Sequence, residues 1–208
     1  VGSMAMGAGG LSVALAMAGE AYVIAMPKVV KIHLTGKLPG WATGKDVILH
    51  LLGKLTVKGG VGKVMEYAGP GVATLSVPER AVITNMGAEL GATTSIFPSD
   101  DATKAFFTAM GRPEDFTPLA ADPDATYDEV VEIDLSSLEP LAAAPHMPDR
   151  MARIADLDGM KVDQVCIGSC TNSSYADLKA VAQILAGKRI DPSTDLLISP
   201  GSKQVLKM

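Results

Sequence analysis

The sequence predicts an α/β protein, built from three-layer α/β/α units with mostly parallel sheets. Short apolar runs rich in β-branched residues alternate along the 208 residues with stretches that have helical periodicity. Glycines and capping residues separate the two kinds of segment. Aromatic residues make up only 4% of the chain, so small and aliphatic side chains must form a tightly packed core. Helices that connect successive strands imply parallel pairing.

In the first quarter of the chain, residues 9–18 are predicted as a helix that begins at a glycine pair and ends at a glycine. Residues 29–34 are predicted as a strand. Thr43 and Asp46 then have the spacing of an N-cap and an acid three residues later. The helix that they begin has an apolar face with amphipathic spacing, formed by Val47, Ile48, Leu51, Leu52 and Leu55.

The next segments continue this alternation. Residues 61–68 are predicted as a short helix, and a capping box at 76–79 begins another helix that runs to about Leu90. Residues 93–97 are predicted as a strand, and 99–111 as a capped helix.

Residues 112–160 differ in character, with many prolines and aspartates, and are predicted as an extended connector. A strand is expected within it at 130–135. Beyond it, strands at 165–168 and 196–199 flank a helix at 174–186. This βαβ pattern predicts a parallel pair of strands.

Composition excludes several classes of protein. The net charge is -5 and there is no basic stripe, which argues against nucleic acid as a partner. The apolar segment 4–26 is interrupted by glycines and Glu20, and it contains no uninterrupted run of the ~20 residues that span a bilayer. No basic residue precedes it, so no signal peptide is predicted. Two cysteines do not make a disulfide scaffold, which favours a reducing, intracellular setting.

Cys170 is the strongest candidate for chemistry. It follows an apolar strand and a Gly-Ser turn, and a capped helix begins just after it. A helix N-terminus stabilises a thiolate, and ligands of open α/β sheets gather at the carboxyl ends of strands. The alternative is a small buried cysteine in a tight turn. Cys166 lies within the strand and is expected in the core.

Asn85 and Glu89 form a second candidate pair. They are four residues apart on the predicted helix and would share one face, where an amide and a carboxylate can orient a water or a ligand hydroxyl. Gly87 between them permits the close approach of another backbone. The alternative is an ordinary exposed polar face.

A cysteine-dependent hydrolase is a rival interpretation of Cys170. It requires a histidine placed as a base. The three histidines, His33, His50 and His146, lie in a strand, on a polar helix side and in the connector, and none is marked as a base by its sequence context.

The chain also resembles the aconitase family along most of its length. The resemblance is carried, in order, by 7–19, 31–55, 66–71, 85–98, 134–140, 145–149 and the Cys-Thr-Asn-Ser-Ser-Tyr run at 170–175. It implies that 1–27 end a first α/β domain, 28–111 form a second, 112–160 connect, and 161–208 begin a third that carries the cysteine turn.

The resemblance implies an iron–sulfur hydro-lyase that isomerises citrate to isocitrate through cis-aconitate, at the open iron of a [4Fe-4S] cluster. Cys170 would be one of three cluster ligands, with two further cysteines outside this chain. Asn85 would hydrogen-bond near the cluster, and Glu89 would orient the substrate hydroxyl and help to move its proton. The family's substrate loop, its carboxylate-binding arginines and its serine base are absent, so the chain is expected to be a fragment that is inactive alone.

Two alternatives stay open. One is a related hydro-lyase acting on 3-isopropylmalate or homoaconitate. The other is a cluster-free binding or regulatory domain of the same fold. The expected partners are a tricarboxylic acid and the missing parts of the same parent protein. The expected location is the bacterial cytoplasm or the mitochondrial matrix.

Overall fold

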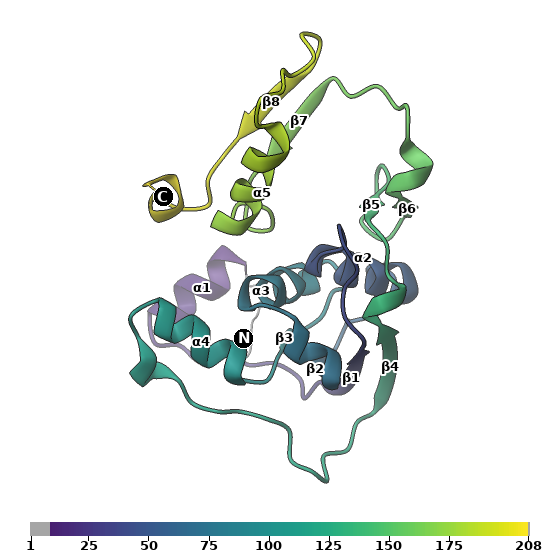
Figure 1. The fold of residues 1–208 in the computed structure, drawn as a ribbon. Helices are drawn as coiled ribbons and strands as arrows, with labels where there is room; N and C mark the ends of the chain where they lie inside the picture. Colours follow the sequence, from purple (N-terminus) through teal and green to yellow (C-terminus); the bar gives the residue numbers. More distant parts are fainter. Residues whose placement is uncertain (1–8, 208) are drawn as a thin grey trace. The chain divides into compact units, whose positions relative to one another are not determined.

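The computed structural model describes residues 9–207 and divides the chain into two compact units (Figure 1). The first unit ends at Ile154 and the second begins at Ala155. The residues of the 7–19 segment that precede Gly9 lie outside the described part. Among the described residues, no helix has the length and apolar content needed to cross a membrane.

The first unit is built on a four-stranded sheet in which every neighbouring pair of strands is parallel. The strand order is β3-β2-β1-β4. Their bounds are Lys28–Thr35 for β1, Lys63–Ala68 for β2, Thr94–Ile96 for β3 and Glu129–Asp134 for β4. Burial alternates along β1, as expected for a strand with one face on a core.

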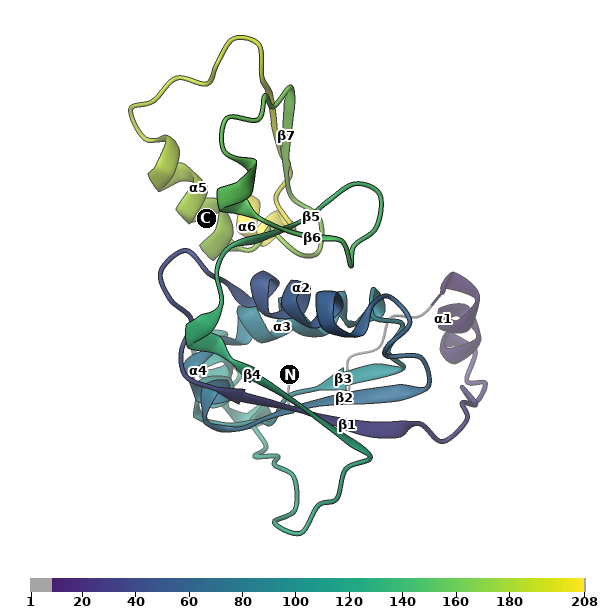
Figure 2. The same ribbon diagram turned by 90° about the vertical axis from the view of Figure 1, so that its right-hand side faces the viewer.

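Helices cover one face of this sheet (Figure 2). The helices of the unit are α1 (Gly10–Met17), α2 (Gly44–Leu55), α3 (Val77–Asn85) and α4 (Asp101–Ala109), and its 3₁₀ turns include η1 (Pro70–Thr74) and η2 (Met86–Ala88). Apolar side chains of α2 and α3 share one buried cluster with the inward residues of β1 and β2. A mainly parallel sheet flanked by helices confirms the predicted α/β class.

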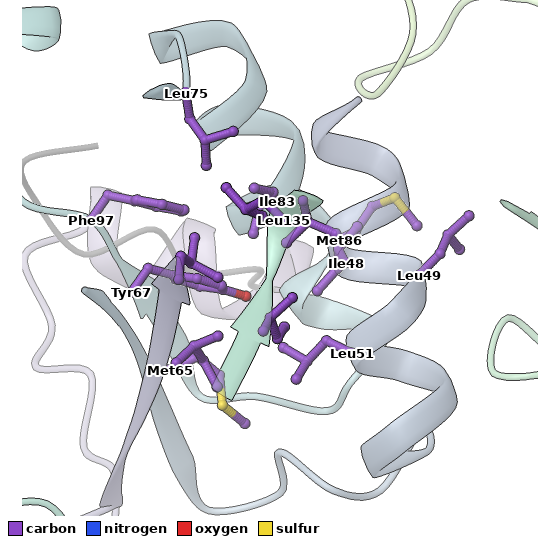
Figure 3. Packing of buried hydrophobic residues seen from close by; sticks show 14 of the residues in the cluster. Ile48, Leu49, Leu51, Met65, Tyr67, Leu75, Ile83, Met86, Phe97 and Leu135 are labelled. Carbon is purple, nitrogen blue, oxygen red and sulfur yellow. The ribbon is translucent and has the colours of Figure 1, made fainter. Parts of the chain in front are cut away.

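The core lies between this sheet face and α2 with α3. Figure 3 shows the stacked rings of Tyr67 and Phe97, whose centroids are 4.4 Å apart, beside aliphatic side chains from the helices. All five side chains predicted for the apolar face of α2 contribute, four of them fully buried and Leu55 partly buried. The amphipathic pattern in the sequence therefore correctly predicted which face of α2 is buried in the core.

Two predicted elements are different in the structure. Residues 61–68 were expected to form a helix, and this is wrong: Lys63–Ala68 is strand β2. Its neighbours decide the conformation, because it pairs with β1 and β3 and buries alternate residues, Met65 and Tyr67. The helix expected to reach Leu90 ends at Asn85, and the tighter turn η2 follows it.

The segment expected as a connector takes part in the first unit. Its strand, expected at 130–135, is β4, which forms an edge of the sheet beside β1. It then forms an antiparallel hairpin of β5 (Leu141–Ala143) and β6 (Met151–Arg153) that contacts α2. Two hydrogen bonds fasten the hairpin: the Leu141 N–H donates to Asp46 Oδ1 at 2.7 Å, and the Val57 N–H donates to Asp149 Oδ2 at 3.1 Å.

The second unit contains the predicted βαβ motif. Strands β7 (Gln164–Ile167) and β8 (Asp195–Ile198) are parallel, and α5 (Tyr175–Leu185) connects them. A short helix, α6 (Lys203–Lys207), follows. Apolar side chains of α5 and of one strand face surround a hollow of about 300 Å³. Cys166 was expected in the core and is exposed instead, because α5 covers the face of β7 that carries Val165 and Ile167.

Candidate functional site

Cys170 lies in a turn just beyond the carboxyl end of β7, as predicted. Hydrogen bonds hold this turn from both sides. The Asn172 N–H donates to the Gly168 carbonyl at 3.3 Å, and the Ser173 hydroxyl donates to the Ser169 carbonyl. The segment after β8 closes the other side, where the Gly201 N–H donates to the Ser173 carbonyl at 3.2 Å. The thiol is therefore carried on a constrained loop.

The start of this turn requires glycine, because there is no space for a side chain. A Cβ atom on Gly168 would lie 2.9 Å from the Ser199 carbonyl oxygen, closer than side chains pack. Ser169 follows with φ of +65°, a left-handed conformation that non-glycine residues adopt rarely. The loops after β7 and β8 are thus pressed together directly beside Cys170.

The helix after the turn, predicted at 174–186, is α5 and begins at Tyr175. The N-cap of α5 is Ser174, four residues beyond Cys170. Ser174 and Asp177 form a capping box: the Asp177 N–H donates to Ser174 Oγ at 3.2 Å, and the Ser174 N–H donates to Asp177 Oδ2 at 3.0 Å. The first turn of α5 therefore already has the Ser174 hydroxyl as an acceptor and the Asp177 carboxylate beside it. The positive end of the helix dipole acts on these groups and not on Cys170 alone.

The donor set around Cys170 is small. The thiol is exposed, and its sulfur lies 4.0 Å from Ser169 Oγ and 4.0 Å from Thr171 Oγ1. Within residues 9–207, no three histidine, cysteine or acidic side chains gather closely enough to hold a metal. At this turn the described part of the chain offers the exposed Cys170 thiol, which is a single candidate ligand and not a complete metal site.

Asn85 and Glu89 lie in the first unit, on either side of η2. Both side chains are exposed. A 3₁₀ turn has about 3.0 residues per turn, against 3.6 in an α-helix, so the two residues are rotated further apart around the axis than predicted. The expectation that they share one helical face rested on a continuous α-helix, which the structure does not have.

The backbone that follows Asn85 and Glu89 shows which end of the sheet this pair lies near. The chain after η2 meets the amino end of β2, because the Thr93 N–H donates to the Lys63 carbonyl at 2.8 Å and the Gly60 N–H donates to the Leu90 carbonyl at 2.9 Å. Cys170 belongs to the second unit and follows the carboxyl end of a strand. The structure thus brings Asn85 and Glu89 together on one turn and carries Cys170 on a separate unit.

The polar groups at the carboxyl ends of β2 and β3 were not predicted from the sequence. A cavity of about 300 Å³ lies there, lined by Glu66, 67–69, 96–98 and 119–121. The Tyr127 hydroxyl donates to Glu66 Oε1 at 2.7 Å beside it. Burial, together with the hydrogen bond and the charge of Glu66, raises the pKa of Tyr127 to about 12. Nothing in the local sequence signalled this contact, because the two residues are 61 positions apart.

Arg80 was missed too, although a signal existed. It is fully buried on α3, where helical spacing places it on the same face as Ile83 and Thr84, which are also buried. A histidine of the first unit is partly buried as well: desolvation, and then the positive charge of Lys54, lower the pKa of His50. All three histidines lie in the first unit, whereas Cys170 lies in the second.

Comparison with known proteins gives a consistent result. The family model described as "Aconitase family (aconitate hydratase)" matches residues 1–208. The chain is 43% identical to the mitochondrial aconitate hydratase of Candida albicans and 42% identical to the mitochondrial homocitrate dehydratase of Saccharomyces cerevisiae, over 99% of its own length and 29% of each of theirs. It is 36% identical to the 3-isopropylmalate dehydratase large subunit of Syntrophus aciditrophicus, over 100% of this chain and 49% of that protein.

The chain spans between a quarter and a half of the length of these relatives. Their names describe hydro-lyases of several hydroxy acids. The full-length match to the family model and the α/β fold agree, and the chain belongs to the aconitase family.

Proposed function

We propose that this chain is part of an iron–sulfur hydro-lyase that isomerises citrate to isocitrate through cis-aconitate. The observation that carries the proposal is the constrained, exposed Cys170 beyond the carboxyl end of β7, within a chain that matches the family over its whole length. A ligand-bearing loop needs such constraint, because a preorganised ligand loses little freedom when the group binds.

Cys170 would hold one iron of a [4Fe-4S] cluster through its thiolate. The residues fit this role in part: Cys170 offers its exposed sulfur at the turn, and two further cysteine ligands are expected outside the chain. When bound, such a cluster supplies an open iron that acts as a Lewis acid on the substrate hydroxyl and carboxylate. The hydroxyls of Ser169 and Thr171 lie next to the sulfur and can donate to it, which tunes a ligand.

The roles proposed for Asn85 and Glu89 use the chemistry of their side chains. The Asn85 amide can both donate and accept a hydrogen bond, which orients a neighbouring ligand group. The Glu89 carboxyl group is exposed and can orient the hydroxyl that leaves, give it a proton so that it departs as water, and take that proton back when water adds again. The η2 turn presents both groups from one short stretch of backbone.

The substrate is proposed to be a tricarboxylic acid. The identity of 43% to an aconitate hydratase favours citrate. The alternative is a related acid, since a relative named 3-isopropylmalate dehydratase large subunit matches all of the chain and one named homocitrate dehydratase matches 99% of it. Exposed thiols at Cys166 and Cys170 suit a reducing compartment, and the bacterial cytoplasm or the mitochondrial matrix is proposed.

The test is anaerobic iron–sulfur reconstitution of the full-length protein that carries this chain, followed by visible absorbance and by aconitate formation from citrate. We expect wild type to gain the cluster absorbance and the activity, and Cys170→Ser to lose both. Cys166→Ser is the matched control: it changes an exposed cysteine on β7, four residues before Cys170, and should keep both.

Other results have definite meanings. Activity on 3-isopropylmalate or homoaconitate without activity on citrate would change the proposed substrate but keep the reaction class. A full-length protein that takes up no iron would reject the hydro-lyase and favour a cluster-free binding domain. The 208-residue chain assayed alone should show no turnover, because Cys170 by itself cannot hold the cluster.

A further inference from the structure

We propose that Gly87 is a positioning residue, whose missing side chain lets the η2 turn rest on Ser95 and so fixes the backbone that carries Asn85 and Glu89. This inference rests on the proposed function for its effect on turnover. The contact itself is a property of the first unit and can be tested without any activity.

The contact between Gly87 and Ser95 leaves no room for a methyl group. Gly87 is buried, and a Cβ atom placed on it would lie 2.5 Å from Ser95 Oγ but 3.6 Å from Ser95 Cβ. The first distance is a clash and the second is ordinary van der Waals contact. Only the hydroxyl oxygen of Ser95 therefore excludes alanine at position 87. The φ angle of Gly87 is not in the left-handed region, so space rather than backbone conformation selects glycine here.

Ser95 is a firm support for the turn. It lies in β3, where its Cα pairs with that of Met65 in the parallel register, and only 1% of its surface is exposed. Buried neighbours restrict the rotation of its side chain. Its hydroxyl has no hydrogen-bond partner among the described residues, so its interaction with Gly87 is steric. Removing this hydroxyl takes away the contact without breaking a hydrogen bond.

Movement at Gly87 would reach the functional residues through the backbone. The Ala92 N–H donates to the Gly87 carbonyl at 3.2 Å, and the Glu89 N–H donates to the Met86 carbonyl at 3.1 Å. Gly87 is two residues from Asn85 and two from Glu89. A methyl group at position 87 would push the turn away from β3 and shift both side chains.

The test is a double-mutant cycle of Gly87→Ala, Ser95→Ala and the combined variant in the full-length protein. Turnover is measured per bound cluster, and hydrogen exchange is followed at the Glu89 and Ala92 amides. Gly87→Ala should lower kcat by about 100-fold, the effect of displacing a reacting group by about 1 Å, and should leave KM little changed. It should also speed exchange at both amides. The combined variant should recover most of both losses, because the remaining Cβ–Cβ distance is an ordinary contact.

Gly40→Ala is the control for adding a methyl group to a glycine, since no atom lies within 4 Å of the position that its Cβ would take. It should leave both readouts as in wild type. The inference is overturned if Gly87→Ala keeps the wild-type kcat and exchange, or if removing the Ser95 hydroxyl restores neither. A wild-type protein without turnover would reject the proposed function, and the exchange cycle would still decide the positioning contact.

Discussion

The Arg80 guanidinium is fully buried and forms a two-pronged ion pair with Asp100, with Nη1–Oδ1 at 2.8 Å and Nη2–Oδ2 at 2.7 Å. Its other three donors bind the carbonyls of Leu75, Pro98 and Val72 at 3.0 to 3.3 Å. All five N–H groups are therefore satisfied. Arg80 therefore joins η1 and the residue after it, helix α3 and the segment that leads into α4.

Replacing Arg80 by lysine is predicted to destabilise the folded protein. Arg80→Lys keeps the charge but replaces a planar fork of five donors by a single ammonium, so buried acceptors lose their partners. We expect a loss of about 3 kcal/mol in the free energy of unfolding, measured by urea or thermal denaturation. Arg112→Lys is the matched control, because its pair with Asp115 is exposed and should contribute less than about 1 kcal/mol. Equal losses in the two variants would contradict this account.

The ionisation of Asp100 makes the stability contributed by the Arg80–Asp100 pair depend on pH. Burial raises the pKa of its carboxyl, but the hydrogen bond and charge of Arg80, with the N–H groups of Thr103 and Ala102, outweigh burial and hold the pKa below its usual value. A carboxyl with a lowered pKa stabilises the folded state above its unfolded pKa of about 3.9, and this contribution is lost as the pH falls through the folded pKa.

The prediction is that wild type exceeds Asp100→Asn in melting temperature at neutral pH, and that this difference shrinks as the pH falls below about 4. A series of thermal melts from neutral to acidic pH measures it. A difference that stays constant across the series would show that the charge of Asp100 is not the cause.

Local sequence signals predicted the helices that have their own caps. The boxes at Thr43 with Asp46 and at Ser76 with Glu79 are both present. Strand β2 was missed because a short apolar run between glycines is compatible with either a helix or a strand, and only its pairing with β1 and β3 decides between them.

The same distinction applies to the candidate site. The strand and turn around Cys170 are local and were predicted, whereas contacts between distant residues were not. Arg80 meets Asp100 across 20 positions, and Asp46 meets Leu141 across 95. The 3₁₀ turn after Asn85 brings Gly87 close against Ser95 of β3, and no local pattern reveals this contact.

Glu89 is predicted to affect chemistry and not folding. Its side chain is exposed at the end of η2, so Glu89→Gln should change the free energy of unfolding by less than about 0.5 kcal/mol. If it moves the substrate proton, kcat should fall by about 100-fold or more while the cluster absorbance of the full-length protein is kept. Glu114→Gln, another exposed glutamate in the same unit, is the control. Loss of the absorbance in Glu89→Gln would assign this residue to cluster binding.

Asp46 is predicted to join the start of α2 to the β5–β6 hairpin. Its carboxylate is 5% exposed, and its two oxygens accept from different parts of the chain. Oδ2 accepts from the Thr43 N–H at 2.7 Å, and Oδ1 accepts from the Leu141 N–H at 2.7 Å. An amide at this position would turn a donor towards one of these two N–H groups, so that this N–H would lose its acceptor.

Asp46→Asn should therefore cost about 1 to 3 kcal/mol and should speed hydrogen exchange at Thr43 or Leu141, whichever amide meets the new donor. Asp101→Asn, at an exposed position in the first turn of α4, is the control and should leave exchange at both amides unchanged. Faster exchange at Leu141 would show that the hairpin depends on Asp46, whereas faster exchange at Thr43 alone would limit its role to the helix cap. Unchanged exchange at both amides would mean that neither bond contributes to local stability.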